Sequence, residues 1–340
     1  MRINRKMLIA GISSAIALII LAGGLFLLTR GGKTVVKPTA ERHSQRASRK
    51  ARKLRSPFTG ERVARLRPEL IFKIDNVVQA RPPTGLTKAD IVYILPVDAG
   101  LSRIFAVFSS HIPRVVGPVR SSREEDIELL RQFGRPAFAF SGAQPRLLPV
   151  VEHSRIVDLY AGIVGGYYRD YSRVEPYNLY ARTKVLLAEA KGRESKARNI
   201  GFRFGPAPRG GRPRKSYSVT YPEASFTFRW SRKQHRWLSS MDGGPAYSAG
   251  GRRLGARTVV IQYVKVGLSG FRELGIKPPF ANTVGRSRAV VLRDGRAYRV
   301  RWSRPHARSG TAFTLPDGRR MPFARGQVWI VYGYGPGSSR

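Results

Sequence analysis

The sequence predicts an α/β N-terminal domain with a layered, mixed sheet, a smaller antiparallel β-rich C-terminal domain, and one transmembrane helix that precedes both. Three observations support this prediction. Residues 7–29 contain no charged side chain, which is typical of a membrane span. Short apolar runs alternate with helical stretches from about residue 66 to 200, which indicates an α/β layer fold. After residue 215, aromatic and β-branched residues alternate with polar ones, which is typical of strands.

Residues 7–29 form the predicted anchor, within a tail-and-anchor segment of residues 1–30. As a helix at ~1.5 Å per residue, this stretch reaches about 34 Å, enough to cross roughly 30 Å of hydrocarbon. Its length and the absence of a small-residue cleavage site favour an uncleaved anchor over a cleaved signal peptide. The protein is therefore predicted to contact the membrane through this segment.

The charges around the anchor allow two orientations. Three basic residues precede it within residues 1–6, and six follow it within residues 30–49, so the positive-inside rule taken literally places the body in the cytoplasm. A long domain that follows an anchor is, however, exported largely regardless of charge. We predict a cytoplasmic N-terminus and an extracytoplasmic body at the cell membrane.

Residues 31–58 hold nine basic residues, one acid and no apolar periodicity. Such a segment cannot bury enough apolar surface to fold by itself, so we predict a disordered stalk. Next to a membrane, a basic run attracts anionic lipid headgroups, at about 1 kcal/mol per cation, and a cell-wall polymer would be attracted in the same way. A purely solvated linker is the alternative.

The formal net charge of +41 favours polyanionic partners, whether nucleic acid, anionic lipid or an acidic wall polymer. The chain has no cysteine, which excludes disulfides, thiolate nucleophiles, Cys-based zinc sites and a lipid-modified cysteine. Its five histidines are scattered without metal-ligand spacing. The sequence therefore predicts no metal site and no cofactor.

The N-terminal domain is predicted over residues 59–204, with one clear helix at 122–134. Ser122 and Glu125 have the spacing of a capping box, and Gly134 ends the helix. Weaker helical patterns cover residues 143–153 and 183–192, and buried strands are predicted at residues 70–75, 90–95, 103–110, 137–142 and 155–160.

A linker rich in Pro, Gly and cations is predicted at residues 205–215, before the C-terminal domain of residues 216–334 and a tail of residues 335–340. Within that domain, residues 290–303 form a predicted hairpin with Asp294-Gly295 in its turn. Further strands are predicted at residues 216–222, 225–232, 235–241, 258–266 and 327–335.

Several ordered motifs resemble the YerB-like family of bacterial envelope proteins. In this sequence they are FKIDNVVQARPPTGLTKADIVY, GLSRIFAVFSS, VGPVRSSREED, YSRVEPYNLYAR and VLRDGRAYRVRWSR, and the resemblance spans about residues 60 to 333. Tyr177 stands where the family usually has His. The resemblance implies a membrane-tethered, extracytoplasmic protein with a domain of unknown function and no known reaction. Many relatives are lipoproteins, whereas here a spanning helix would replace the missing cysteine.

Asp75 and Asn76 end a predicted strand, where α/β folds gather ligand contacts. Asp75 could act as a general base, bind a cation or pair with Arg81, and the alternative is an Asx turn that only shapes the backbone. Asp90 begins the next strand and is predicted to accept hydrogen bonds in a turn.

An anion pocket is predicted at Arg120, Ser121 and Arg123, with Arg103 nearby, because guanidinium groups at a helix start bind carboxylate or phosphate. The alternative is that these arginines pair with the acids at residues 124–126.

Tyrosines are interleaved with arginines between residues 167 and 180. Such a cluster can stack on sugars or bases, or it can pack an interface between domains. The cluster consists of Tyr167, Tyr168, Tyr171, Tyr177 and Tyr180 with Arg169 and Arg173, and from this region Asn178 and Tyr180 are candidate binding residues.

The function favoured by the sequence is a binding, scaffold or regulatory module of the cell envelope that recognises an anionic polymer, a lipid surface or an envelope protein. No catalytic residue is assigned, and an enzyme is not favoured. Two alternatives are kept. One is an envelope hydrolase with a site around Asp75, Arg120 and Asn178, and the other is an inward-facing nucleic-acid binder, although an extracytoplasmic body makes a nucleic-acid partner unexpected.

Overall fold

The computed structural model describes residues 54–273 and 275–338. The predicted cytoplasmic tail, the anchor and nearly all of the stalk lie outside these residues. Among the described residues, no helix is long and apolar enough to cross a membrane. The helices here are short: α2 (Glu124–Leu130), α3 (Leu148–Glu152) and α4 (Thr183–Ala190), with 3-10 turns η1 (Val78–Ala80), η2 (Leu86–Lys88), η3 (Asp98–Gly100) and η4 (Arg131–Phe133).

Strands predominate, and the largest sheet has eleven of them in the order β10-β20-β19-β16-β23-β2-β3-β1-β5-β6, with β21 beside β20. Its N-terminal strands are β1 (Leu70–Asp75), β2 (Ile91–Pro96), β3 (Ser102–Phe108), β5 (Ala137–Phe140) and β6 (Val157–Tyr160). Its C-terminal strands are β10 (Arg212–Pro213), β16 (Thr258–Val264), β19 (Gly285–Arg293), β20 (Arg296–Arg304), β21 (Ala312–Thr314) and β23 (Val328–Tyr334).

The mixed sheet predicted from the N-terminal half is confirmed. β1 pairs with β3 antiparallel and with β5 parallel, and β5 pairs with β6 parallel. All five apolar runs of this half form strands, because buried strands of mixed sheets are apolar on both faces.

The C-terminal half is not purely antiparallel, and that part of the prediction is wrong. β23 pairs parallel with both β2 and β16. It lies between the strands of the two halves, so the segments on either side of residues 205–215 contribute to one continuous sheet. The first six residues of β23 are buried, as expected for a central strand covered on both faces.

The remaining strands form smaller sheets. A five-stranded sheet contains β11 (Ser216–Thr220), β12 (Ser225–Ser231), β13 (Arg236–Met241), β14 (Gly244–Pro245) and β15 (Gly255–Ala256). A three-stranded sheet contains β4 (Val115–Val116), β7 (Tyr167–Arg169) and β8 (Leu179–Arg182). Two pairs complete the set: β17 (Val266–Leu268) with β18 (Pro279–Ala281), and β9 (Arg203–Phe204) with β22 (Pro322–Phe323).

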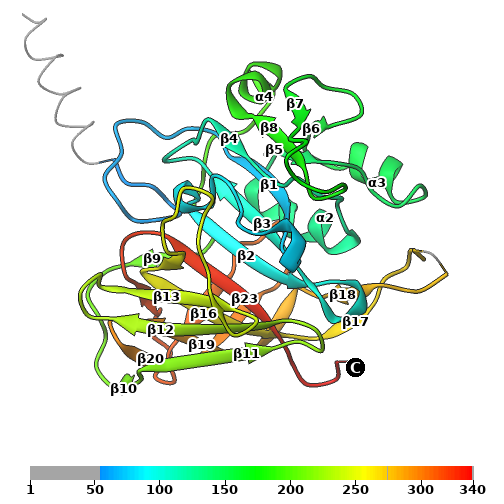
Figure 1. Cartoon of the computed structure of the whole chain (residues 1–340). Helices are drawn as coiled ribbons and strands as arrows, with labels where there is room; N and C mark the ends of the chain where they lie inside the picture. The colour runs from blue at the N-terminus through cyan, green and yellow to red at the C-terminus, as the bar shows by residue number, and fades with distance from the viewer. Residues whose placement is uncertain (1–53, 274, 339–340) are drawn as a thin grey trace, which may run out of the picture. The chain divides into compact units, whose positions relative to one another are not determined.

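Both faces of the large sheet are covered. One face packs with Leu130 of α2 and Val151 of α3. The other packs with Leu186 of α4 and, at the C-terminal end, with Phe228 and Trp237 of the five-stranded sheet. Figure 1 shows β12 and β13 lying over β16 and β19, while α2, α3 and α4 gather around β1, β5 and β6. The loops between these two groups of elements form the site described below.

Helix α2 begins later than the sequence predicts. Its N-cap is Arg123, whose backbone N–H donates to Asp126 Oδ2 at 2.8 Å. The predicted capping box of Ser122 and Glu125 is therefore wrong, because the buried Asp126 takes that role and also accepts from Ser122 Oγ at 3.2 Å. Lys73 of β1 donates to Asp126 Oδ1 at 2.6 Å, so one carboxylate joins the helix start to the sheet.

The predicted hairpin is confirmed as β19–β20. Arg293 faces Arg296 across a two-residue turn, and the turn residues Asp294 and Gly295 have φ of 49° and 70°. These positive values match the Asp-Gly preference of a type I′ turn.

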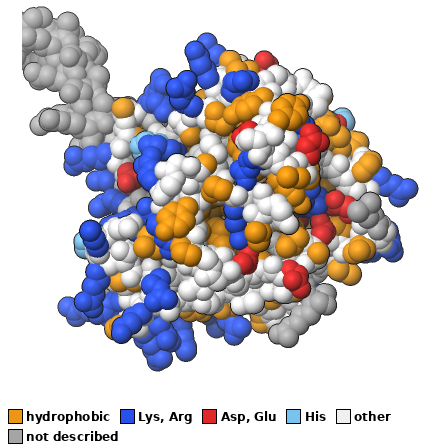
Figure 2. Space-filling model, viewed as in Figure 1, with side chains coloured by type: hydrophobic (Ala, Val, Ile, Leu, Met, Phe, Trp, Pro, Cys, Tyr) orange, Lys and Arg blue, Asp and Glu red, His pale blue; other side chains and the backbone are white. Residues whose placement is uncertain are grey.

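The net positive charge is spread over the surface of the molecule. Figure 2 shows Lys and Arg side chains gathered along the left and lower left of the view, where Figure 1 places β10 and β20. Acidic side chains in the same view lie mainly on the right. On the face seen in this view, basic side chains are therefore unevenly distributed and gather near β10 and β20.

Candidate functional site

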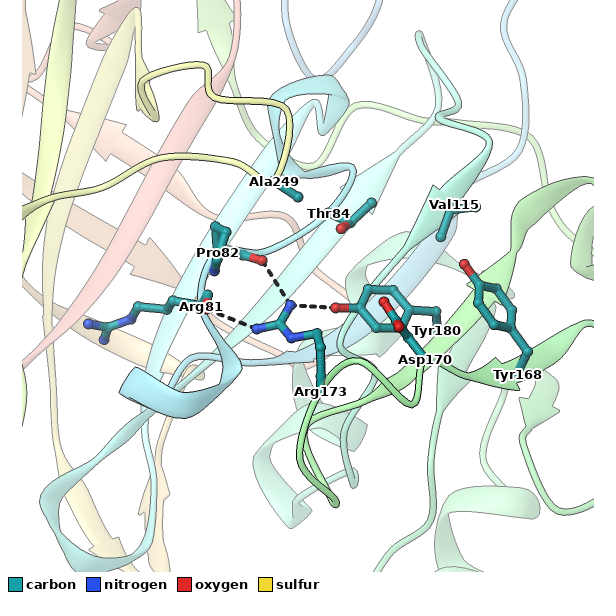
Figure 3. A pocket seen from close by; sticks show the side chains of 9 residues that line it. All are labelled: Arg81, Pro82, Thr84, Val115, Tyr168, Asp170, Arg173, Tyr180 and Ala249. Atoms are coloured by element: carbon teal, nitrogen blue, oxygen red, sulfur yellow. Dashed lines mark hydrogen bonds between the residues drawn. The ribbon is translucent and has the colours of Figure 1, made fainter.

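A pocket of about 560 Å³ lies among the loops that follow β1 and β7 and the start of β4. Its volume is within the range of small-molecule sites. Figure 3 shows the residues that line it: Arg81, Pro82, Thr84, Val115, Tyr168, Asp170, Arg173, Tyr180 and Ala249.

Arg173 is the cation at the centre of this pocket. Its guanidinium donates to the carbonyls of Arg81 at 2.9 Å and Pro82 at 3.2 Å, and to the hydroxyl of Tyr180 (Figure 3). No carboxylate of the described residues lies within 4 Å of it. Neutral oxygens thus fix its position while its positive charge remains available to a ligand.

Two tyrosine rings lie beside this cation, of which Tyr168 is half-buried and Tyr180 is buried. The Tyr168 and Tyr180 centroids lie 5.9 Å apart at an interplanar angle of 29°. The guanidinium of Arg182 lies 4.4 Å from the Tyr168 centroid, within the range of a cation–π contact. Burial raises the pKa of Tyr180, so its hydroxyl stays neutral and able to hydrogen-bond.

Asp170 is the single acid that lines the pocket. The hydroxyl and the backbone N–H of Ser172 donate to its Oδ1 at 2.6 and 3.1 Å. These bonds lower the pKa of Asp170, so the carboxylate is ionised at neutral pH and suited to accept hydrogen bonds from hydroxyl groups.

Of the residues named from the sequence, Arg81 and Tyr180 line this pocket, together with Tyr168 and Arg173 of the tyrosine–arginine cluster. The Arg81 guanidinium points away from Tyr180 in Figure 3 and pairs with Asp242 at 2.7 Å. It does not pair with Asp75, which corrects that part of the prediction. Arg81 also donates to the carbonyl of Asn76 at 2.7 Å, which ties the loop to the end of β1.

Asp75 forms an Asx turn and an ion pair at the same time. Its Oδ1 accepts from the backbone N–H of Asn76 at 2.8 Å and Val77 at 3.4 Å, while its Oδ2 lies 2.9 Å from Arg120 Nε. The Asn76 amide donates to Ser102 Oγ at 2.9 Å. Because the Asp75 carboxylate is 2% exposed and already occupied on both oxygens, its role in this structure is architectural.

The predicted anion pocket around Arg120, Ser121 and Arg123 is filled by carboxylates of the chain itself. Arg120 pairs with Asp75, and Arg123 pairs with Asp98 at 2.6 Å and Glu273 at 2.9 Å. The alternative partners at residues 124–126 are not used by either guanidinium, because these acids bind other groups.

Arg103 completes this arginine cluster and is buried like Arg123, with 8% and 5% of the two residues exposed. Its guanidinium donates to the carbonyl of Ser121 at 3.3 Å. Burial, and next the nearby charge of Arg123, lower the pKa of Arg103 to about 10. Since Arg103 remains charged at neutral pH, the neighbouring Asp75 and Asp98 are needed to stabilise the cluster.

Two other predicted residues lie apart from the pocket. Asp90 precedes β2 and lies at the opposite end of the strands from Asp75. Its Oδ2 accepts hydrogen bonds from the backbone N–H groups of Ser109 and Ser110, at 2.7 Å each. These bonds are the turn role predicted for it, and burial raises its pKa to about 6. Asn178 is fully buried and accepts from Arg169 at 2.7 Å.

Sequence reasoning missed five residues that line the pocket: Pro82, Thr84, Val115, Asp170 and Ala249. Thr84 lies inside the family motif of residues 72–93, and Asp170 directly precedes the motif of residues 171–182. Neither gave a signal, because short polar residues in turns are common. Ala249 comes from the loop between β14 and β15, far from the other lining residues in sequence. Only the packing of the five-stranded sheet against the N-terminal half brings it there.

Two family models match the chain. Residues 58–197 match the N-terminal domain, and residues 217–330 the C-terminal domain, of a protein of unknown function (DUF3048). The chain belongs to the DUF3048 family. This membership confirms the resemblance to YerB-like proteins, and the two matched segments meet in the large sheet through β2 and β23.

A relative in this family is "Putative lipoprotein YerB" of Bacillus subtilis (strain 168), which is 25% identical over 299 residues, 82% of this chain and 86% of YerB. The crystal structure of Bacillus subtilis YerB superimposes with a TM-score of 0.72 at 21% identity, over 82% of this chain and 96% of that one. The DUF3048 fold is therefore shared across nearly the whole of YerB.

Proposed function

We propose that this DUF3048 protein is a membrane-anchored, extracytoplasmic binding protein of the cell envelope whose pocket recognises an acidic saccharide. The observation that carries the proposal is the guanidinium of Arg173, which is held by neutral oxygens beside the stacked rings of Tyr168 and Tyr180. The terminal N–H groups of Arg173 donate to the carbonyls of Gln79, Arg81 and Pro82 and to the hydroxyl of Tyr180, so a carboxylate or phosphate would be attracted by its charge and its Nε–H. The half-buried Tyr168 supplies apolar surface for a sugar, and Asp170 suits its hydroxyl groups.

Binding is favoured over catalysis by the chemistry of the pocket. A hydrolase needs an acid or base with a pKa near neutrality close to the reacting bond, whereas hydrogen bonds from Ser172 lower the pKa of Asp170, the acid that lines the pocket. The lining residues do not include Asp75, Arg120 or Asn178. This pocket therefore does not support the hydrolase alternative.

Two observations, one from the sequence and one from the family, support the proposed location. The relative YerB is named a lipoprotein, while this chain has no cysteine and an uncharged stretch at residues 7–29. We infer that this stretch is the membrane tether and that the body is outside the cytoplasm, where envelope glycans are accessible.

Replacing Arg173 with glutamine should weaken binding of oligogalacturonate about tenfold or more, because a hydrogen bond to a charged group contributes about 1.5–3 kcal/mol. Isothermal titration with oligogalacturonate and with a neutral oligosaccharide of equal length measures this. Tyr180→Phe removes one contact of Arg173 and keeps the ring, so it should weaken binding less. The control is Arg155→Gln, an exposed arginine outside the pocket. Equal affinity of Arg173→Gln and the parent for the acidic probe would reject the pocket.

A reporter enzyme that is active only outside the cytoplasm, fused after Arg340, should be active in the full-length protein. A reporter active only in the cytoplasm should be silent at the same position. The opposite pair of results would contradict the orientation and support the inward-facing nucleic-acid binder instead.

A further inference from the structure

One face of the β19–β20 hairpin carries four exposed arginines: Arg286, Arg288, Arg299 and Arg301. They share a face because side chains alternate along a strand and because Arg288 lies directly opposite Arg301. Like charges that face each other across a strand pair destabilise a sheet. Their arrangement therefore has a cost that a bound anion would remove.

These four arginines differ from the other three in the same hairpin. Arg293 binds Asp294 and the backbone carbonyl of Pro322. Arg296 donates to the carbonyl of Gly211. The buried Arg304 donates to carbonyls of the loop after β20. Among the described residues, none of the four has a carboxylate within 4 Å or a side-chain hydrogen bond to protein. The hairpin thus separates structural arginines on one face from unpartnered ones on the other.

The surroundings of the four arginines are polar and basic. Arg288 stacks on Tyr263 at 4.8 Å, and the Tyr263 hydroxyl is 3.2 Å from that of Tyr217. Thr314 lies opposite Arg301 on β21. Arg212 of β10 pairs with Ala297 and so lies on the same face. Within residues 285–304 the single acid is Asp294, which is bound to Arg293.

We propose that this arginine face binds a linear polyol-phosphate polymer of the cell envelope. Guanidinium groups bind phosphate bidentately, and arginines two residues apart along a strand stand about 6.8 Å apart. Phosphates that are separated by a short polyol have a comparable spacing, so one polymer chain can contact successive arginines along the two strands.

A membrane surface and a nucleic acid fit this face less well. Stable interfacial binding to a bilayer needs protruding apolar side chains, and no described residue of β19, β20 or β21 is a large exposed hydrophobic. Binding of single-stranded nucleic acid uses aromatic rings that are free to stack on bases, whereas Tyr263 already stacks on Arg288.

The double variant Arg299→Gln/Arg301→Gln tests the proposal in the full-length protein. We expect its affinity for poly(glycerol phosphate) of defined length to fall at least tenfold. The dependence of log K on log salt should also become less steep, because fewer counterions are released when fewer arginines contact phosphates. A charge-matched control, Arg155→Gln/Arg252→Gln, changes two exposed arginines elsewhere and should leave affinity and slope near those of the parent.

Two further measurements separate binding from folding and from other ligands. Because Arg301→Gln removes the like-charge pair with Arg288, thermal stability should stay equal or rise, and a loss of stability that parallels the loss of binding would overturn the proposal. Equal affinity of the double variant and the parent would also overturn it, as would tighter binding to oligothymidylate or to phosphatidylglycerol vesicles through the same arginines. The pocket variant Arg173→Gln should bind poly(glycerol phosphate) normally, so the two sites can fail independently.

Discussion

Replacing Lys73 with methionine should lower the free energy of unfolding by about 3–5 kcal/mol, the cost of leaving buried charges without their partner. Lys73 is fully buried on β1, where its ammonium lies 2.6 Å from Asp126 Oδ1 and 3.7 Å from Glu125 Oε1. Methionine has a similar length and fills the space, so the loss reflects charge and not a cavity. Denaturant unfolding at neutral pH measures the change.

The matched control is Lys184→Met on α4, which removes an exposed lysine and should change stability by less than about 0.5 kcal/mol. A second variant, Lys73→Met/Asp126→Asn, removes the charge of both members of the closer pair. It should recover part of the loss, because the Asp126 carboxylate is then no longer buried without its cation. If Lys73→Met unfolds at the same denaturant concentration as the parent, this buried pair does not contribute to stability.

The sequence predicts the strands of this fold well because apolar runs and turn residues are local signals. β1 matches its predicted range residue for residue, and the Asp294-Gly295 turn sets the β19–β20 register. The order of strands in the sheet cannot be predicted in the same way, because it depends on contacts between distant parts of the chain. β23 is apolar along nearly its whole length, which indicates a central strand but does not say that β2 and β16 are its neighbours.

The candidate site shows the same division between local and distant contacts. The Asx turn at Asp75 involves the next two residues, and an Asp-Asn pair at a strand end is enough to suggest it. The partners of Arg81 and Arg123 are Asp242 and Glu273, which lie in the other half of the chain. No spacing rule connects them, so arginines that look available in the sequence are paired in the structure.

Which arginines remain unpaired is therefore the useful result of the structure. The chain has 41 more cations than acids by formal charge, so most of its arginines lack a carboxylate of their own. Arg173 is held by carbonyls in a pocket, whereas the four β19–β20 arginines lie on an exposed face of the sheet. A pocket suits one saccharide unit and a row of arginines suits a repeating polymer, which is why the two surfaces are assigned different ligands.

Replacing Glu69 with glutamine should make stability less dependent on pH and should stabilise the protein at alkaline pH. Glu69 is 1% exposed, and neither carboxyl oxygen has a hydrogen-bond partner in the described part of the chain. Burial raises its pKa from 4.5 to about 8, although Arg198 opposes the shift and Asp90 adds to it. Between pH 4.5 and about 8, the Glu69 carboxyl therefore stays protonated in the native state but is ionised in the unfolded chain.

The sign of the effect follows from this difference. The favourable contribution of protonated Glu69 is complete below pH 4.5 and is lost as the pH rises to about 8, at up to 1.4 kcal/mol per pH unit and on the order of 4 kcal/mol in total. Burial also raises the pKa values of Asp90 and Glu125, to about 6 and 7. These two groups make the parent less stable as the pH rises, just as Glu69 does. The effect of Glu69 is therefore the difference between variant and parent at each pH. Urea unfolding should show the Glu69→Gln protein close to the parent near pH 4.5 and more stable near pH 8.5, while the exposed Glu189→Gln shows no such divergence. If the two unfolding curves stay parallel across this range, the Glu69 carboxyl is ionised in the native state and must have a cationic partner in solution, for which Arg198 is the nearest candidate.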